Sequence, residues 1–126
     1  MAVDLVIDIE NTPGSLACVA AAISDAGVNM AAATCVGSHE RAELHILVKH
    51  AGAAKHSLAT AGVLVTRESE VVVVNVEDHP GVLADLTRKV AEAGVNLDLV
   101  YIATQNRVVF GAADLDALRA ALGVAS

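Results

Sequence analysis

The sequence predicts an α+β protein made of two tandem copies of one small βαββαβ unit, each an antiparallel sheet with two helices on one face. The first observation is a repeat. The phrase from Glu10 to Asn29 returns as Glu77 to Asn96, 67 positions later, and ten of the twenty-four pairs over residues 6–29 and 73–96 are identical. The second observation is that strand-like and helix-like apolar periodicities follow in the same order in both copies. We therefore divide the chain into units of residues 1–68 and 69–126.

The first copy shows all six elements of the unit. Residues 3–9 alternate as a half-buried strand does, and a turn at residues 11–14 leads into a helix over 13–26 that ends at Gly27. The remaining predicted elements are a strand over 28–36, a strand over 42–48, a helix over 52–61 and a strand over 63–67. This order is the split βαβ pattern of ferredoxin-like folds.

The second copy repeats this order but is shorter at its end. We expect a strand over 71–76, a helix over 80–93, a strand over 95–104, a turn at residues 105–106, a strand over 107–110 and a helix over 115–122. Gly123 and Val124 then match Gly62 and Val63, and the sequence stops at Ser126. We therefore expect the second unit to lack most of its last strand, and strand 71–76 to have an unpaired edge.

Composition narrows the classes of function. The net charge is −7 and aromatic residues are 2% of the chain, so neither a basic surface nor stacking platforms for nucleic acid are expected. No apolar run approaches the roughly 18 residues of a membrane span, and the first residues do not read as a signal peptide. We expect a cytoplasmic protein with no nucleic-acid or membrane partner. Cys18 and Cys35 lie in alanine-rich segments and are expected to be small buried residues without a disulfide.

Two apolar surfaces predict self-association. Helix 13–26 carries a single charged residue, and Val71, Val73, Val100 and Ile102 are expected to give the second copy an apolar outer sheet face. Elements that are apolar nearly all round are normally buried on more than one side. We therefore expect a homodimer or higher homo-oligomer, with helix 13–26 between its own sheet and another copy of the unit.

The repeated loop and helix start is the candidate ligand site of each copy. Backbone N–H groups at a helix start suit a carboxylate, and the glycine of each Pro-Gly pair lets a ligand approach the backbone closely. Asn29 and Asn96 can both donate and accept, and Asp78 favours an ammonium. The alternative left open is that Asn11 and Asp78 only cap their helices, and that the later asparagines only fix a turn.

Catalytic and metal sites are not expected. The five histidines show no His-x-x-x-His spacing, and the chain has no Cys-x-x-Cys pair. No nucleophile and base stand in a recognisable arrangement. We therefore expect neither enzyme activity nor a metal or cofactor. His79, in the candidate loop, is either a solvated side chain or a ligand contact.

These residues resemble the ACT domain, a small regulatory module that binds amino acids. The resemblance rests on the [N/D]-x-P-G-x-L-A loop, the A-G-V-N phrase and the βαββαβ order, and it covers the chain as two copies. In the family, modules pair side by side, and ligands bind between the first loop of one module and the helix and strand of another. The ligand contacts that this implies here are Asn11, Thr12, Pro13, Gly14, Ser15, Leu16 and Asn29 in copy one, and Asp78, His79, Pro80, Gly81, Val82, Leu83 and Asn96 in copy two.

The resemblance implies a non-catalytic regulatory protein that binds an amino acid between paired units and modulates an assembly or a partner enzyme. The alternative is a structural module that drives oligomerisation without a small-molecule ligand. Family members that bind serine carry a histidine two residues before the loop's polar residue, where this chain has Ile9 and Val76. The identity of the ligand and the copy that binds it therefore stay open.

Overall fold

The computed structural model describes residues 2–124, which form two compact units, one up to Ser69 and one from Glu70 onward. Within these residues, the first unit has a four-stranded sheet with two helices, and the second has a three-stranded sheet with two helices. The predicted α+β class and the order of the elements are confirmed. Each unit is described by itself below.

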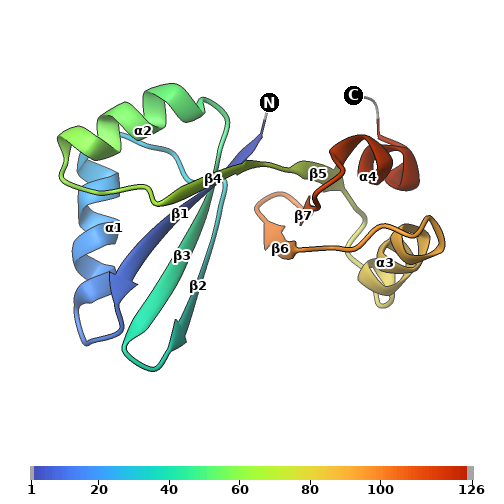
Figure 1. The fold of residues 1–126 in the computed structure, drawn as a ribbon, viewed down its shortest axis with the longest axis horizontal. Helices are drawn as coiled ribbons and strands as arrows, with labels where there is room; N and C mark the ends of the chain where they lie inside the picture. Colours follow the sequence, from blue (N-terminus) through green and yellow to red (C-terminus); the bar gives the residue numbers. More distant parts are fainter. Residues whose placement is uncertain (1, 125–126) are drawn as a thin grey trace. The chain divides into compact units, whose positions relative to one another are not determined.

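Unit 1 is built around its central strands. Its elements are β1 (Val3–Glu10), α1 (Ser15–Asp25), β2 (Ala32–Ser38), β3 (Arg41–Val48), α2 (Ala51–Thr60) and β4 (Arg67–Glu70), with strand order β2-β3-β1-β4. The antiparallel register places Leu5 opposite Ile46, so both side chains point to the face that α1 and α2 cover (Figure 1). There they meet Ile23 of α1 and Leu58 of α2 in one hydrophobic core.

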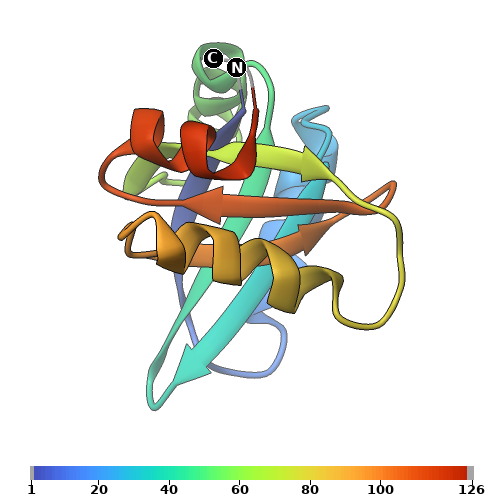
Figure 2. The ribbon, with the colours of Figure 1, turned by 90° about the vertical axis from the view of Figure 1, so that its right-hand side faces the viewer.

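Unit 2 repeats this arrangement with one strand fewer among the described residues. Its elements are β5 (Val72–Asn75), α3 (Val82–Glu92), β6 (Leu99–Ala103), β7 (Arg107–Gly111) and α4 (Leu115–Leu122), with strand order β5-β7-β6. Both helices lie on one face of the sheet (Figure 2), over a core that contains Val72, Val90, Phe110 and Leu118. β5 is an edge strand, as predicted. Residues 125–126, at the end of what is expected to remain of the last strand, lie outside the described part of the chain.

The strand that follows the first helix of each unit starts later than predicted. β2 begins at Ala32 and β6 at Leu99, each four residues later than expected. The backbone N–H groups of Val28 and Val95 instead donate to carbonyls of the preceding helix, at 3.3 and 3.2 Å. This bond closes a helix after a C-terminal glycine, and it prevents the same residue from joining the sheet. The fourth strand is displaced in the same direction and starts at Arg67.

The register of β6 corrects the prediction for two apolar side chains. Val100 and Ile102 lie opposite Phe110 and Val108, which belong to the core under the helices. They therefore point to the helix face and not to the outer face. Because β6 is an edge strand, Val100 stays 38% exposed and Ile102 71% exposed. The residue between them, Tyr101, points to the opposite face and is buried.

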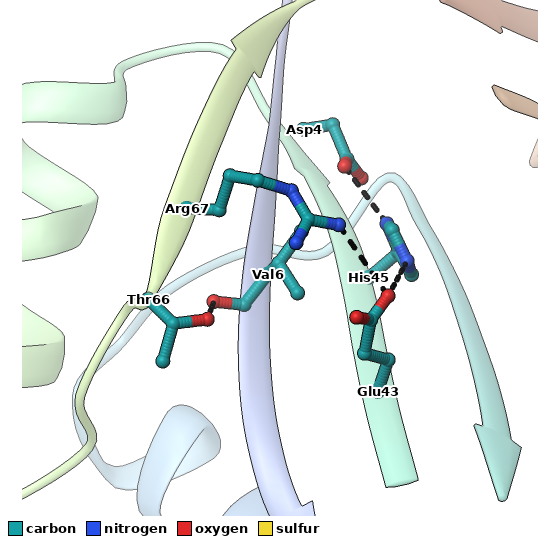
Figure 3. A network of polar contacts seen from close by, with 6 residues as sticks. All are labelled: Asp4, Val6, Glu43, His45, Thr66 and Arg67. Atoms are coloured by element: carbon teal, nitrogen blue, oxygen red, sulfur yellow. Dashed lines mark hydrogen bonds and ion pairs between the residues drawn. The ribbon is translucent and has the colours of Figure 1, made fainter. Parts of the chain in front are cut away.

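A row of charged side chains crosses the sheet of unit 1 on the face opposite its helices (Figure 3). Asp4 Oδ2 lies 2.8 Å from Nδ1 of His45, and Nε2 of the same imidazole lies 3.0 Å from Oε1 of Glu43. Arg67 of β4 donates to that glutamate oxygen at 3.4 Å. Thr66, next to it, donates to a β1 carbonyl from its backbone N–H and from its hydroxyl. Asp4 is only 2% exposed, so its carboxylate is buried beside an ionisable partner.

The two cysteines are exposed, which contradicts the burial expected from the sequence. α1 buries only Ile23 fully, while Leu16 and Cys18 face away from the core. Cys35 lies on the edge strand β2. An alanine-rich helix offers similar side chains on every side, so the sequence does not mark the side that packs on the sheet.

Candidate functional site

Each candidate site begins where the first strand of a unit gives way to its first helix. Gly14, with φ 86°, and Gly81, with φ 89°, are the N-cap residues of α1 and α3. This left-handed backbone suits glycine and strains other residues. It also interrupts the helix predicted from the proline onward, so α1 starts at Ser15 and α3 at Val82, two residues later than expected.

Neither of these helix starts has a side-chain cap. The capping role considered for Asn11 and Asp78 is therefore wrong. Asp114 shows the difference, because its carboxylate does cap α4 and accepts a hydrogen bond from the Ala117 N–H at 3.0 Å. The first turns of α1 and α3 thus keep backbone N–H groups that no side chain satisfies, which is the arrangement that accepts an anionic group.

In unit 1 the loop is fastened to the β2–β3 hairpin by Asn11. Its side-chain Nδ2 donates to the carbonyl of His39 at 3.0 Å, and its backbone N–H donates to the next hairpin carbonyl at 2.9 Å. The side chain lies against Gly37, where an added Cβ would stand 2.7 Å from Nδ2. The hydroxyls of Thr12 and Ser15 lie 2.6 Å apart. The polar side chains of this loop therefore bond within unit 1.

In unit 2 the equivalent loop is open. Asp78 makes no hydrogen bond or ion pair with another described residue, and it lines a hollow of about 250 Å³ with Val82 and Leu83. The other lining residues come from the end of the first strand and from the β6–β7 hairpin: Val76, Ile102, Ala103, Asn106, Arg107 and Val108. Figure 2 shows the loop after β5 and this hairpin at the same end of the unit.

His79 takes no part in lining this hollow. Its Nδ1 lies 2.9 Å from the carbonyl oxygen of Pro80, to which it donates, and the ring is exposed. Of the six loop residues predicted as contacts in unit 2, the hollow thus gathers Asp78, Val82 and Leu83.

Arg107 is the charged residue of the hollow that the sequence did not reveal. Its Nε donates to the carbonyl of Thr104 at 2.9 Å, and its Nη2 donates to the Thr104 hydroxyl at 3.0 Å. Each of the other arginines has a carboxylate within ion-pair distance: Arg41, Arg67, Arg88 and Arg119. Arg107 has none among the residues described. The predicted topology could have indicated Arg107, because in a βαββαβ unit the hairpin between the second and third strands lies at the same end of the sheet as the first loop.

Electrostatics differ on the hairpin of unit 1. Arg41 donates to Asp8 at 2.9 Å, and this hydrogen bond raises the pKa of the arginine. The hairpin arginine of unit 1 is therefore matched by a carboxylate of its own unit. Within residues 2–124, no group of three potential ligands could hold a metal ion, and no helix is long and apolar enough to cross a membrane.

The two predicted asparagines lie at the far end of the helices from the loops. α1 and α3 each contain 11 residues, which is about 16 Å of helix. Neither unit therefore brings its own asparagine to its own loop. Asn96 donates to Asp98 at 3.3 Å. Asn29 lines a hollow of about 350 Å³ with Lys49 and His50 near the start of α2.

Comparison with known proteins matches part of unit 2 to a family model and nearly the whole chain to solved structures. The ACT domain model matches residues 71–122. Among solved structures, protein BT0572 from Bacteroides thetaiotaomicron is 23% identical, with a TM-score of 0.82 over 96% of this chain and 85% of that one. The regulatory subunit of aspartate kinase from Thermus thermophilus is 21% identical, with a TM-score of 0.66 over 99% and 92% of the two chains. The same subunit from Thermus flavus is 22% identical, with a TM-score of 0.63 over 97% and 90%.

No curated protein matches the sequence significantly. The structural matches show the fold over nearly the whole chain, and the family model identifies the domain that makes up most of unit 2. The elements of unit 1 follow the order of unit 2, with the same glycine at the helix start. Residues 71–122 thus match the ACT domain, and the whole chain resembles a tandem pair of ACT-like units in its fold.

Proposed function

We propose that this chain is a non-catalytic regulatory protein that binds an amino acid at the loop–helix starts of its paired ACT-like units. Binding shifts the equilibrium of an assembly or of a partner enzyme. The observation that carries the proposal is that both helix starts are exposed and have no side-chain cap. The likeness to regulatory subunits of aspartate kinase supports regulation of an activity held by another chain. The proposal includes a cytoplasmic location.

An amino acid suits these positions because it carries an anion and a cation on one carbon. The uncapped N–H groups at a helix start stabilise a carboxylate. Asp78, and the side-chain oxygens of Asn29 and Asn96, accept hydrogen bonds from an ammonium. Self-association follows from the proposal, since the loop and the asparagine of one unit lie at opposite ends of a helix.

A thermal-shift screen of the full chain against the standard amino acids tests this function. A ligand at a hundredfold excess over its dissociation constant adds about 2.7 kcal/mol to the free energy of unfolding, which raises Tm by several degrees. Four alanine variants then locate the binding residues: Asn11→Ala, Asn29→Ala, Asp78→Ala and Asn96→Ala. Asn11→Ala and Asp78→Ala change the loops, and Asn29→Ala and Asn96→Ala change the asparagines after the helices. If one variant of each kind loses the thermal shift, that loop and that asparagine bind the same ligand.

The absence of a shift with every amino acid would overturn this function. A shift that survives all four variants would keep amino-acid binding but remove it from the loops. Asp114→Ala serves as the control, because it removes a carboxylate from a helix start that is already capped. That variant lowers stability without changing the response to the ligand.

A second candidate function is a structural module that drives association without a small ligand. The side of α1 that carries Ala17, Cys18 and Ala21 is apolar and exposed. Arg88 of α3 occupies the position equivalent to Ala21. If α1 mediates association, Ala21→Arg dissociates the oligomer in sedimentation velocity, whereas Arg88→Ala does not. Association together with a null amino-acid screen would favour this function.

A further inference from the structure

Building on the proposed function, we infer that the hollow of unit 2 selects an amino acid with an aliphatic side chain. Asp78 accepts from the ligand's ammonium, Arg107 donates to its carboxylate beside the uncapped N–H groups at the start of α3, and Leu83 and Ile102 contact its side chain. This assigns a ligand class to the chain and a binding role to the hairpin arginine. The inference stands on three features of the hollow: its unmatched charges, its apolar walls and its size.

The charges of the hollow are one of each sign, and neither is matched. Asp78 and Arg107 both line it, yet they form no ion pair with each other or with another described residue. A zwitterion supplies the two missing partners at once, whereas a simple anion or cation supplies one. Opposite charges held apart on one surface are therefore the pattern expected for a zwitterionic ligand.

Arg107 is held in place before any ligand arrives. Two of its five N–H donors are used by Thr104, on the carbonyl and on the hydroxyl, so the guanidinium plane is fixed. The remaining donors keep their capacity for a carboxylate. A fixed guanidinium loses less conformational freedom on binding than a mobile one, which favours affinity.

Apart from Asn106, the rest of the wall is apolar. Val82 and Leu83 come from α3, and Ile102 comes from β6. Leu83 is 40% exposed and Ile102 is 71% exposed, so both would lose contact with water when covered by an aliphatic side chain. Asp78 and Arg107 are the charged residues of the lining, so no further charge is left to pair with a charged ligand side chain. At about 250 Å³, the hollow lies below the range of about 300 to 1,000 Å³ typical of drug-sized ligands, which fits a small metabolite.

Unit 1 does not offer the same site. Its loop side chain, Asn11, is bonded to the hairpin at His39, and its hairpin arginine, Arg41, is paired with Asp8. Unit 1 thus has a neutral amide where unit 2 has the Asp78 carboxylate, and the charge of its hairpin arginine is matched by an aspartate. The inference therefore predicts one aliphatic amino-acid site per chain.

The first experiment uses the unmodified full chain and three probes in isothermal titration calorimetry. L-Leucine carries both charges, leucinamide lacks the carboxylate, and isocaproate lacks the ammonium. We expect L-leucine to bind, and each analogue to bind about tenfold more weakly or worse, because each leaves one charge of the hollow without its partner. L-Aspartate and L-lysine are expected to bind more weakly than L-leucine.

The second experiment assigns each charge to its residue. Arg107→Gln is expected to weaken L-leucine about tenfold but to leave leucinamide unchanged, because leucinamide has no carboxylate to lose. Asp78→Asn is expected to weaken L-leucine and to leave isocaproate unchanged. Arg88→Gln, on the exposed face of α3, is the matched control and should bind L-leucine as the unmodified chain does. Should Arg107→Gln not fold, Arg107→Lys tests the same group with its charge kept.

The outcomes separate this inference from the proposed function. Equal losses for L-leucine and leucinamide in Arg107→Gln would mean that the arginine only shapes the hairpin, and would overturn its binding role. If a charged amino acid binds tightly, and if neither Arg107→Gln nor Asp78→Asn changes its affinity, the aliphatic ligand class is overturned while the proposed function stands. If none of the standard amino acids binds, both fall together.

Discussion

The two first loops of this protein come from one repeated phrase, yet they reach different states. In unit 1, Asn11 donates its side-chain amide to the His39 carbonyl and closes the loop on the hairpin. In unit 2, the equivalent Asp78 has no described partner and borders a hollow. A carboxylate has no hydrogen to donate, so an aspartate cannot make the bond that the asparagine makes. The exchange of a side-chain amide for a carboxylate thus distinguishes the loop that is bonded to its hairpin from the loop that is open.

The hairpins reinforce this difference. The side chain of Asn11 fits because Gly37 lies beneath it, and unit 2 has Thr104 at the equivalent position. The carbonyl and the hydroxyl of Thr104 instead accept hydrogen bonds from Nε and Nη2 of Arg107. These two bonds hold the guanidinium at the edge of the hollow. A glycine and a threonine at the same place in the repeat therefore give a structural hairpin in unit 1 and a charged one in unit 2.

The largest expected effect concerns the outer faces of the two sheets. Asp4 and His45 occupy the places that hold Val71 and Val109 in unit 2. We expect His45→Val alone to cost about 3 kcal/mol of unfolding free energy, because it leaves the buried Asp4 carboxylate without its imidazole. The double variant Asp4→Val with His45→Val copies unit 2 and should recover most of the loss. Urea unfolding of the three proteins measures this, and a strictly additive loss would contradict it.

Valine at the helix-start glycines is expected to cost less. Gly14→Val and Gly81→Val should each destabilise by about 1 to 2 kcal/mol, because both positions have a left-handed backbone. No atom lies within 4 Å of an added Cβ at either site, so the cost comes from the backbone and not from a clash. Asparagine, which tolerates this conformation, should cost less than valine. Equal costs for the two side chains would argue for a packing effect.

The contact between Asn11 and Gly37 makes the fastened loop of unit 1 testable. Gly37→Ala should cost about 1 kcal/mol, because the new Cβ displaces the Asn11 side chain and breaks its hydrogen bond. Once Asn11→Ala has removed that side chain, Gly37→Ala should have almost no further effect. A double-mutant cycle in urea measures the coupling. Independent losses would show that the loop is not held by this contact.

The smallest effect is expected in the open loop of unit 2. Asp78→Ala should change the free energy of unfolding without ligand by less than about 0.5 kcal/mol, because the carboxylate has no described partner to lose. Asp114→Ala should cost about 1 kcal/mol, because it removes a real cap. Differential scanning calorimetry compares the two variants. A larger loss for Asp78 would mean that its carboxylate stabilises the loop.

The sequence predicts the fold well because the fold depends on local periodicity. Alternation in β1 and glycine at the ends of the helices are readable without knowing any distant contact. The starts of β2 and β6 are not readable in this way, because the valine after each glycine bonds back to its helix. The prediction for Val100 and Ile102 fails because their side is set by the register with β7, which places them opposite the core residues Phe110 and Val108.

The candidate site is only half predictable. The loop residues follow from the repeated phrase and from the chemistry of a helix start. Arg107 belongs to the same hollow through the return of a hairpin, which is a long-range property of the sheet. Asn96 is separated from its loop by the length of α3, and the motif that contains both residues does not indicate how far apart they lie in the structure. Residues that share a motif need not share a site.

The distribution of rare residues gives each unit its own natural probe. The chain has one tyrosine, no tryptophan and two cysteines. Tyr101 is buried in unit 2, whereas Cys18 and Cys35 are exposed in unit 1. Tyrosine emission therefore originates in unit 2, and changes in thiol labelling rate report the surroundings of α1 and β2 in unit 1. Each unit can thus be followed by its own signal in the unmodified protein, without an added fluorophore.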